Sequence, residues 1–276
     1  MKFIILIYIA MLTSACSTSS TGLSLFDDSV EVEHLMYTTS FMYPESQGKT
    51  FGFNMKLGYA GTDTVKLIDD IDDISIATNT SLAHGAAPTS NFALGIISHL
   101  DVYYDNGIGL KLQIWGSGAD DAKKGNFSIA LLASDLSFNT KTTTNDTTGS
   151  VKEAEAKIIG SGKHYEVLVG YRTTDETLVY TGPFYTETKV DKIEIFQTNN
   201  TDFTYRGEVA EGEGNNKGLK LGIYNQKQKN WFGTLNTGLG IEAAYSRVEW
   251  KDTFNSPEKE YENDGFHIGG VVTLGW

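Results

Sequence analysis

Three residues in one short stretch, Ser98, His99 and Asp101, have the side-chain types of a hydrolase triad. In such a site a carboxylate orients an imidazole base, and the base activates a nucleophile. Neighbouring residues of a strand point to opposite faces, so we expect His99 to share a face with Asp101 and not to reach Ser98. The nucleophile would have to come from another strand, and His267 is one of the few other imidazoles that could join. We therefore treat His99 and Asp101 as weak catalytic candidates, favour a structural polar network, and expect no enzyme.

The densest charge in the chain is the acidic run Asp69, Asp70, Asp72 and Asp73. Carboxylate oxygens suit hard cations such as Ca²⁺, but the run lacks the glycine and the distal glutamate of an EF-hand loop. A solvated acidic loop is the favoured interpretation, and metal binding is the alternative. Because the sequence has no glycine-rich phosphate loop, zinc-type ligand spacing or dinucleotide fingerprint, we expect no cofactor.

Alternation of apolar and polar residues predicts the elements that position these side chains. Residues 266–276 alternate strictly, and a period of two indicates an extended strand. The same pattern recurs from residue 50 onward, and Asp105-Asn106-Gly107 supplies the positive φ angles of a tight hairpin. The apolar faces predict twelve strands, with ten as the main alternative, near residues 51–59, 92–104, 108–114, 127–133, 154–158, 165–171, 178–184, 193–195, 203–209, 219–223, 233–245 and 266–276.

The opposite faces of these strands are polar and charged. A closed antiparallel transmembrane β-barrel needs apolar side chains outside and a polar lumen, whereas a soluble barrel or sandwich has the same alternation reversed. Aromatic residues at the strand ends, and segments near the roughly 9–11 residues needed to cross, favour the membrane. The side chains predicted to face the lumen are Lys111, Glu166, Arg172, Lys192, Glu194, Arg206, Lys220, Glu242 and His267.

The N-terminus is typical of an export signal, and it sets the predicted domain boundaries. Phe3 to Leu12 is an apolar run too short to span a bilayer, and small residues follow it as a cleavage site. We predict a signal peptide over residues 1–15, an N-terminal linker or periplasmic segment over 16–49, and the barrel over 50–276. Within the second segment, residues 17–32 have linker composition, and 34–43 remain open as a strand, a plug or a short amphipathic piece.

Cys16 is the only cysteine of the 276 residues, so an intramolecular disulfide is excluded. Leu12-Thr13-Ser14-Ala15-Cys16 resembles the lipobox of bacterial lipoproteins, in which the thiol is diacylated. Leu12 stands four residues before the cysteine, where the family usually has a leucine three before it. Ordinary cleavage after Ala15, with an unmodified thiol, is the alternative.

Together these patterns resemble the bacterial outer-membrane β-barrel superfamily over about residues 50–276. The most specific element is the C-terminal signal that the barrel assembly machinery reads, carried here by Ile268, Val272, Leu274 and Trp276. Most members end on Phe. The resemblance implies the bacterial outer membrane as the location, with its lipid, lipopolysaccharide and the assembly machinery as partners. A net charge of −13 without Lys/Arg clusters argues against a nucleic-acid partner.

Membrane barrels have long outer loops and short inner turns. With the C-terminus placed in the periplasm, the chain can be threaded backwards, and each predicted connection is assigned to the outer or the inner side. The threading predicts outer loops at 61–89, 209–217 and 249–264. It predicts inner turns at 105–107, 199–202 and 225–230, and it places the long stretch 139–150 inside, against the rule.

Three functions follow from this reading. The first is a small passive channel or a structural protein of the outer membrane, with weak ion selectivity because the predicted lumen charges are mixed. The alternative is an N-terminally lipidated soluble β-domain that binds a ligand or partner. The third is a barrel enzyme acting on lipids, with His99 as its base.

Overall fold

Twelve strands form the described part of the chain in a computed structural model. Residues 1–22 and 276, which include Cys16 and Trp276, lie outside the description, whose ranges are 23–26, 29–70, 79–145, 153–198, 204–231, 235–253 and 258–275. The strands are β1 (Leu23–Phe26), β2 (Ser29–Tyr37), β3 (Phe53–Asp70), β4 (Asn79–Ile97), β5 (Leu100–Tyr104), β6 (Gly107–Trp115), β7 (Phe127–Asn145), β8 (Glu153–Arg172), β9 (Thr177–Thr198), β10 (Thr204–Trp231), β11 (Leu235–Asp252) and β12 (Lys259–Gly275). Among the described residues, no helix is long and apolar enough to cross a bilayer.

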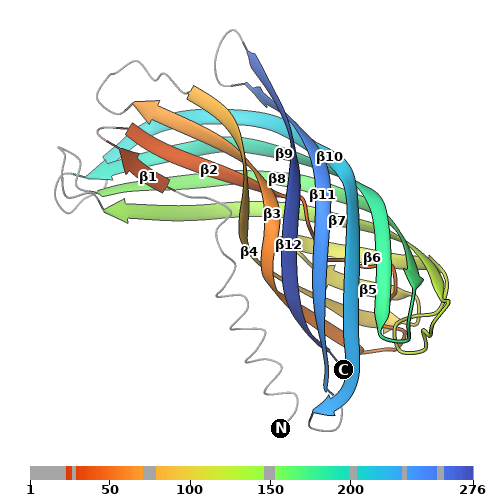
Figure 1. Cartoon of the computed structure of the whole chain (residues 1–276). Helices are drawn as coiled ribbons and strands as arrows, with labels where there is room; N and C mark the ends of the chain where they lie inside the picture. Colours follow the sequence, from red (N-terminus) through yellow and green to blue (C-terminus); the bar gives the residue numbers. More distant parts are fainter. Residues whose placement is uncertain are drawn as a thin grey trace.

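Ten of these strands close an antiparallel barrel (Figure 1). Each strand from β3 to β12 pairs with the next along the chain, and β12 returns to β3 by pairing Gly270–Gly275 with residues 59–54. The barrel is thus the all-β closed architecture expected from the sequence, with the alternative count of ten strands and not twelve.

The alternative count of ten is confirmed, and the favoured count of twelve was too high because three long strands were each divided in two. In β8, the apolar residues face inward at Ile158 but outward at Tyr165 and Val167. The apolar side of the strand therefore changes partway along a single continuous strand. The strands β9 and β10 were also each divided in two, although in β9 the apolar residues Leu178, Tyr180 and Phe184 face inward. In contrast, residues 92–104 belong to two strands, β4 and β5, which turn at 98–99.

The corrected strands also change the connections. At the end of the barrel where β12 finishes, here the C-terminal end, the connections are 98–99, 116–126, 173–176 and 232–234. The other end, here the far end, carries the connections 71–78, 105–106, 146–152, 199–203 and 253–258. The predicted hairpin at Asp105–Gly107 is present, and Asn106 has a φ of 56°. However, this turn and the one near 200 face the far end, contrary to the threading, and the exceptional stretch 139–150 moves to the far end with them. Most of the predicted loops 61–89 and 209–217 are strand.

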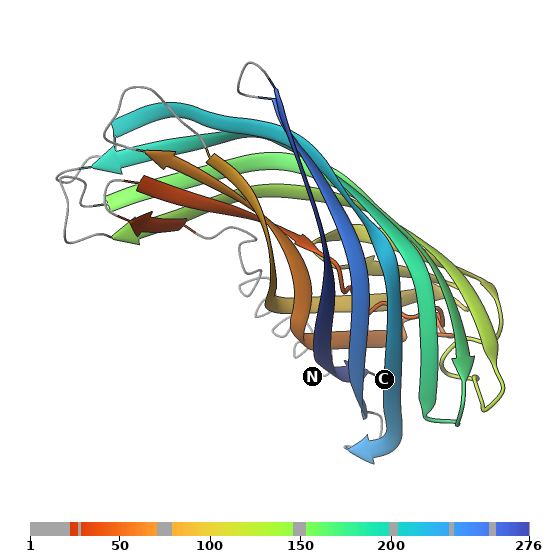
Figure 2. The same cartoon turned by 45° about the horizontal axis from the view of Figure 1, so that its top comes forward.

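Most strands are longer than a bilayer requires, and they continue into a second section at the far end (Figures 1 and 2). Strand β10 has 28 residues, against the roughly 9–11 that suffice to cross. Beyond Tyr59, β3 leaves β12 and pairs with β2, while β4 contacts β12 and β1 contacts β7. We call this region the far section: β1, β2, residues 62–70 of β3, 79–88 of β4, and the parts of β7 to β12 beyond the barrel. Strands β1 and β2 lie where the sequence predicted a linker.

The far section has an apolar core of its own. Met36, Val65, Val248 and Trp250 are buried there, and the ring of His34 lies 6.1 Å from that of Trp250. Burial penalises the charged imidazole and lowers the pKa of His34 to about 4. The N-terminal segment is therefore an integral part of the fold.

Residues 38–47 connect β2 to the turn before β3 by running through the barrel, and all ten are buried. We call them the lumen segment. Of the three interpretations open for residues 34–43, the structure has a strand up to Tyr37 followed by a plug.

Candidate functional site

The outer surface of the barrel is an apolar belt. Among the described residues, exposed large hydrophobic side chains lie on nine of its ten strands, all but β5, and Leu239 and Ile241 are each 63 % exposed. Aromatic side chains flank the belt, with Tyr59, Tyr165, Tyr245 and Phe266 toward the far section and Phe51, Trp115, Phe127 and Tyr171 toward the C-terminal end. A belt of this extent is costly in water and suits hydrocarbon bordered by interfacial rings. The outward direction of the apolar faces is the opposite of what a soluble barrel would have.

An ion pair between Glu45 and Arg172 fixes one end of the lumen segment. The Nε of Arg172 donates to Oε1 of Glu45 at 2.8 Å, and its Nη2 donates to Oε2 at 2.6 Å. Asn126 donates to the same carboxylate at 2.9 Å. Both charged side chains are almost completely buried, so each must compensate the other for the hydration that is lost on burial. This pair ties the segment to β8 of the wall.

A second buried network surrounds Ser40 and joins four strands of the wall, β8 to β11. Lys220 on β10 forms ion pairs with Glu166 on β8 and Glu242 on β11. The backbone N–H of Ser40 donates to Glu242 at 2.9 Å, and Lys220 donates to the Ser40 hydroxyl. Tyr180 donates to the other oxygen of Glu242 at 2.7 Å. One cation is thus shared by two carboxylates, and the lumen segment completes the site.

Further contacts run along the whole lumen segment. Lys111 pairs with Asp101 at 2.9 Å and donates to the backbone oxygen of Glu45 at 2.6 Å. The N–H of Gln47 donates to Asp101 at 3.1 Å, and Lys56 donates to the backbone oxygen of Phe41. Charged wall residues therefore bind backbone groups of the segment that would otherwise lose water without compensation.

The packing is complementary as well as the charges. The rings of Tyr43 and Tyr224 stack at 4.6 Å between centroids. A Cβ at Gly269 of the wall would come within 2.6 Å of the Phe41 ring, and one at Gly170 within 2.6 Å of Pro44. Phe41 itself has a φ of 54°, which is unfavourable for an aromatic residue and needs the surrounding contacts to hold it. The segment and the wall fit as one packed core.

The structure places six of the nine predicted lumen residues inside the molecule: Lys111, Glu166, Arg172, Lys220, Glu242 and His267. Lys192 lies on β9 in the far section and is partly exposed. The side chains of Glu194 and Arg206 lie outside the described part. Five of these charged residues, Lys111, Glu166, Arg172, Lys220 and Glu242, are bound to one another or to the lumen segment and do not line a water-filled path.

The weak catalytic candidates are not brought together. His99 is exposed in the turn after β4, and its Nδ1 lies 2.9 Å from the hydroxyl of Ser98. The expectation that these neighbours could not meet was wrong, because residues 98 and 99 form a turn and not a strand. The expected pairing of His99 with Asp101 is also wrong: the Asp101 carboxylate faces inward to Lys111 and Gln47.

The acidic run gives no described site. Asp69 and Asp70 belong to β3, but their side chains, like Asp72 and Asp73 as a whole, lie outside the description. Sequence reasoning also missed several residues that the structure brings together. Glu45 and Ser40 lie in a segment without alternation, and Asp63 and His84, which approach His267, lie in a stretch predicted to be a loop. A lone glutamate in an otherwise apolar and small-residue stretch was the available signal for Glu45.

Comparisons with known proteins assign no family to the chain. No family model matches the chain, and no curated protein matches it. Among solved structures, the translocator domain of the autotransporter NalP from Neisseria meningitidis is similar over 82 % of this chain and 86 % of that one, with 14 % identity and a TM-score of 0.27. This likeness assigns no activity. A closed antiparallel barrel with an apolar outer belt and a charged interior is the architecture of a membrane-spanning β-barrel.

Proposed function

We propose that this protein is an integral barrel of the bacterial outer membrane whose lumen is closed by its own N-terminal segment. The observation that carries the proposal is the complete burial of residues 38–47 among paired charges of the wall. An open channel needs a water-filled path, whereas these charged side chains already form ion pairs and hydrogen bonds with the segment and with one another. The proposed role is that of a structural membrane protein and not of a passive channel or a catalyst.

The orientation follows from the two ends of the barrel. Barrels of this class have short turns on the periplasmic side and long extensions outside the cell. The far section, with strands of up to 28 residues, therefore extends from the cell surface. Since the lumen segment runs from the far section toward the C-terminal end, β1 and β2 lie on the surface side. Insertion by the barrel assembly machinery, with lipid and lipopolysaccharide around the belt, belongs to the same proposal.

Planar-bilayer recording of the refolded full chain tests the closed lumen. The wild-type protein is expected to give no long-lived conductance steps. Glu45→Lys places a third cation beside Arg172 and Lys111, so the segment is expected to leave the wall and conductance steps to appear. Glu249→Lys makes the same charge change on the outer surface of the far section and should stay silent. Long-lived steps from the wild-type protein would contradict the proposal.

A further inference from the structure

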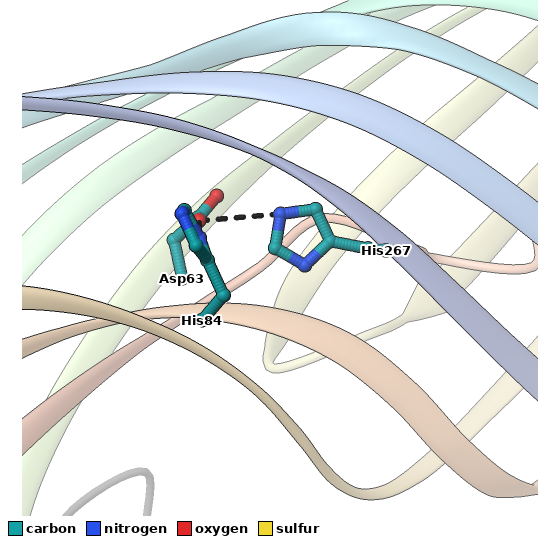
Figure 3. Close-up of side chains that lie close together, drawn as sticks. All are labelled: Asp63, His84 and His267. Carbon is teal, nitrogen blue, oxygen red and sulfur yellow. Dashed lines mark hydrogen bonds and ion pairs between the residues drawn. The ribbon is translucent and has the colours of Figure 1, made fainter.

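Three side chains with metal-binding chemistry meet where β3 and β4 approach β12 (Figure 3). Oδ1 of Asp63 on β3 lies 2.6 Å from Nδ1 of His84 on β4 and 3.2 Å from Nε2 of His267 on β12. All three potential ligand atoms lie within 4.8 Å of one another. Asp63 and His84 are directly opposite each other on the paired strands β3 and β4, and closure of the barrel brings His267 to them.

The cluster lies at a seam in the molecule. Backbone pairing between β3 and β12 ends at Tyr59 and Gly270, so the two strands are joined beyond this point by side chains. Besides the cluster, the amide of Asn263 donates to the backbone oxygen of Leu82 at 3.4 Å. A bond across the seam at this level would hold the far section to the barrel.

The two spacings from Asp63 to the imidazoles are close to those around a tetrahedral ion. Two ligands about 2.0–2.1 Å from such an ion are roughly 3.3 Å apart, which matches the distance between Asp63 and His267. The contact between Asp63 and His84 would lengthen by about 0.7 Å. His84 can make this movement because its side chain is 31 % exposed, whereas those of Asp63 and His267 are 2 % and 1 % exposed. The exposed edge of His84 also gives an ion a route from solvent and leaves a side open for a water ligand.

The surroundings orient the carboxylate as metal sites require. The second oxygen of Asp63 accepts hydrogen bonds from Ser246 at 2.6 Å and Asn216 at 3.0 Å, which leaves Oδ1 for an ion. A Cβ at Gly61 would lie 2.5 Å from the Cβ of His267, and one at Gly265 would lie 2.6 Å from the His84 ring. Glycine at both positions leaves the space that the two imidazoles occupy.

A hydrolase triad is the other chemistry that these residue types suggest, and the geometry does not support it. The hydroxyl of Ser246 and the carboxylate of Asp63 both approach Nε2 of His267. A triad needs the nucleophile and the carboxylate on different ring nitrogens. Ser246 is also completely buried, so no substrate reaches it.

We propose that Asp63, His84 and His267 bind one divalent transition-metal ion of the Zn²⁺ class, and that this ion fastens the far section to β12. Two imidazoles and one carboxylate, with a fourth position for water, form a donor set that Zn²⁺ accepts and Ca²⁺ does not favour. The inference concerns a ligand and is independent of whether the lumen conducts.

Zinc titration of the untagged, refolded full chain tests the site, after a chelator has removed bound metal. Isothermal titration is expected to give one Zn²⁺ per chain, and Co²⁺ should give the visible absorption of a tetrahedral nitrogen–oxygen site. His84→Ala should lower the affinity at least about tenfold, since it removes one of three protein ligands. His99→Ala removes an exposed imidazole elsewhere and should bind as the wild type does. Heat-modifiable migration on gels establishes that each variant is folded.

Ser246→Ala provides a second readout. It keeps the three ligands but releases the second oxygen of Asp63, so a loss of about 10- to 100-fold in affinity is expected. The proposal is overturned if the folded wild-type chain binds no zinc, or if His84→Ala and His99→Ala bind it equally well. Conductance measurements have no bearing on this outcome, so the two proposals fail separately.

Discussion

The barrel and the far section are built from the same strands, but their outward-facing side chains differ: they are apolar on the barrel and charged on the far section. On β11, Ile241 and Tyr245 face outward in the belt while Glu242 is buried in the lumen network. A few residues farther along the same strand, Glu249 is on the outside and Trp250 is buried. The odd-numbered side chains face outward and the even-numbered ones inward at both levels. Only the surrounding medium differs, with hydrocarbon around the belt and water around the far section.

This difference marks the edge of the membrane on the side of the far section. Apolar side chains point outward as far as the girdle of aromatic residues Tyr59, Tyr165, Tyr245 and Phe266. Beyond this girdle, charged side chains point outward. Inside, the lumen contains buried ion pairs together with apolar side chains, whereas the far section has an apolar core around Trp250. Substitutions of one chemical type should therefore have very different effects at the two levels.

Removing the central lumen cation should have the largest effect. Lys220→Met leaves Glu166 and Glu242 buried without their shared cation, and breaking a buried pair from one side typically costs about 3–5 kcal/mol. Urea unfolding of the refolded protein in lipid vesicles measures this change. A loss below about 1 kcal/mol would mean that the lumen is hydrated, contrary to the closed structure.

A charge on the belt should have the next largest effect. Ile241→Arg places a guanidinium in hydrocarbon, and such a change near the bilayer midplane costs roughly 2–4 kcal/mol. Ser161→Arg makes an equally large change on the exposed face of β8 in the far section, where we expect less than about 0.5 kcal/mol. Equal losses at the two positions would remove the distinction between belt and far section.

The core of the far section should become unstable in acid. Burial lowers the pKa of His34 from 6.5 to about 4, so the unfolded state binds more protons than the folded state between these values. The contribution of neutral His34 is complete above pH 6.5 and is lost as the pH falls toward 4. At pH 5 the loss is about 2 kcal/mol relative to pH 7.5.

Unfolding curves at the two pH values measure this loss, with His34→Gln as the control. Glutamine does not titrate, so the variant should lose about 2 kcal/mol less than the wild type over the same pH interval. The other histidines are common to both proteins and cancel in the comparison. If wild type and variant respond equally to pH, His34 is solvated and the far section has a looser core than the structure indicates.

How much the sequence could predict depends on the same difference between sections. Strict alternation beside hydrocarbon, as at residues 266–275, predicts the closed barrel and which side chains face inward. In β8 the apolar face moves from the inner side of the strand, at Ile158, to the outer side, at Tyr165 and Val167, so the sequence pattern divided one strand in two and misplaced the turns. Each strand is continuous, but its surroundings change from hydrocarbon to water along its length.

The lumen segment was beyond pattern reading for another reason. Its ten residues have no regular secondary structure and depend on contacts with β3, β6, β8, β10 and β11. Nothing local fixes Phe41 at a positive φ or pairs Glu45 with a residue 127 positions away. The cluster of Asp63, His84 and His267 is similar, since only the crossing of β3 and β4 toward β12 brings its members together.

The smallest effect is expected for a second lysine on β10, three residues from Lys220. Lys217 pairs with Glu249 at 2.6 Å on the outer face of the far section, where its side chain is 46 % exposed, and this pairing lowers the pKa of Glu249. Exposed ion pairs contribute only about 0–1 kcal/mol, so Lys217→Met should barely change the urea midpoint. It makes the same substitution as Lys220→Met on the same strand, and only the surroundings differ. If both variants lost several kcal/mol, the loss would belong to β10 as a strand, and burial of charge in the lumen would not explain it.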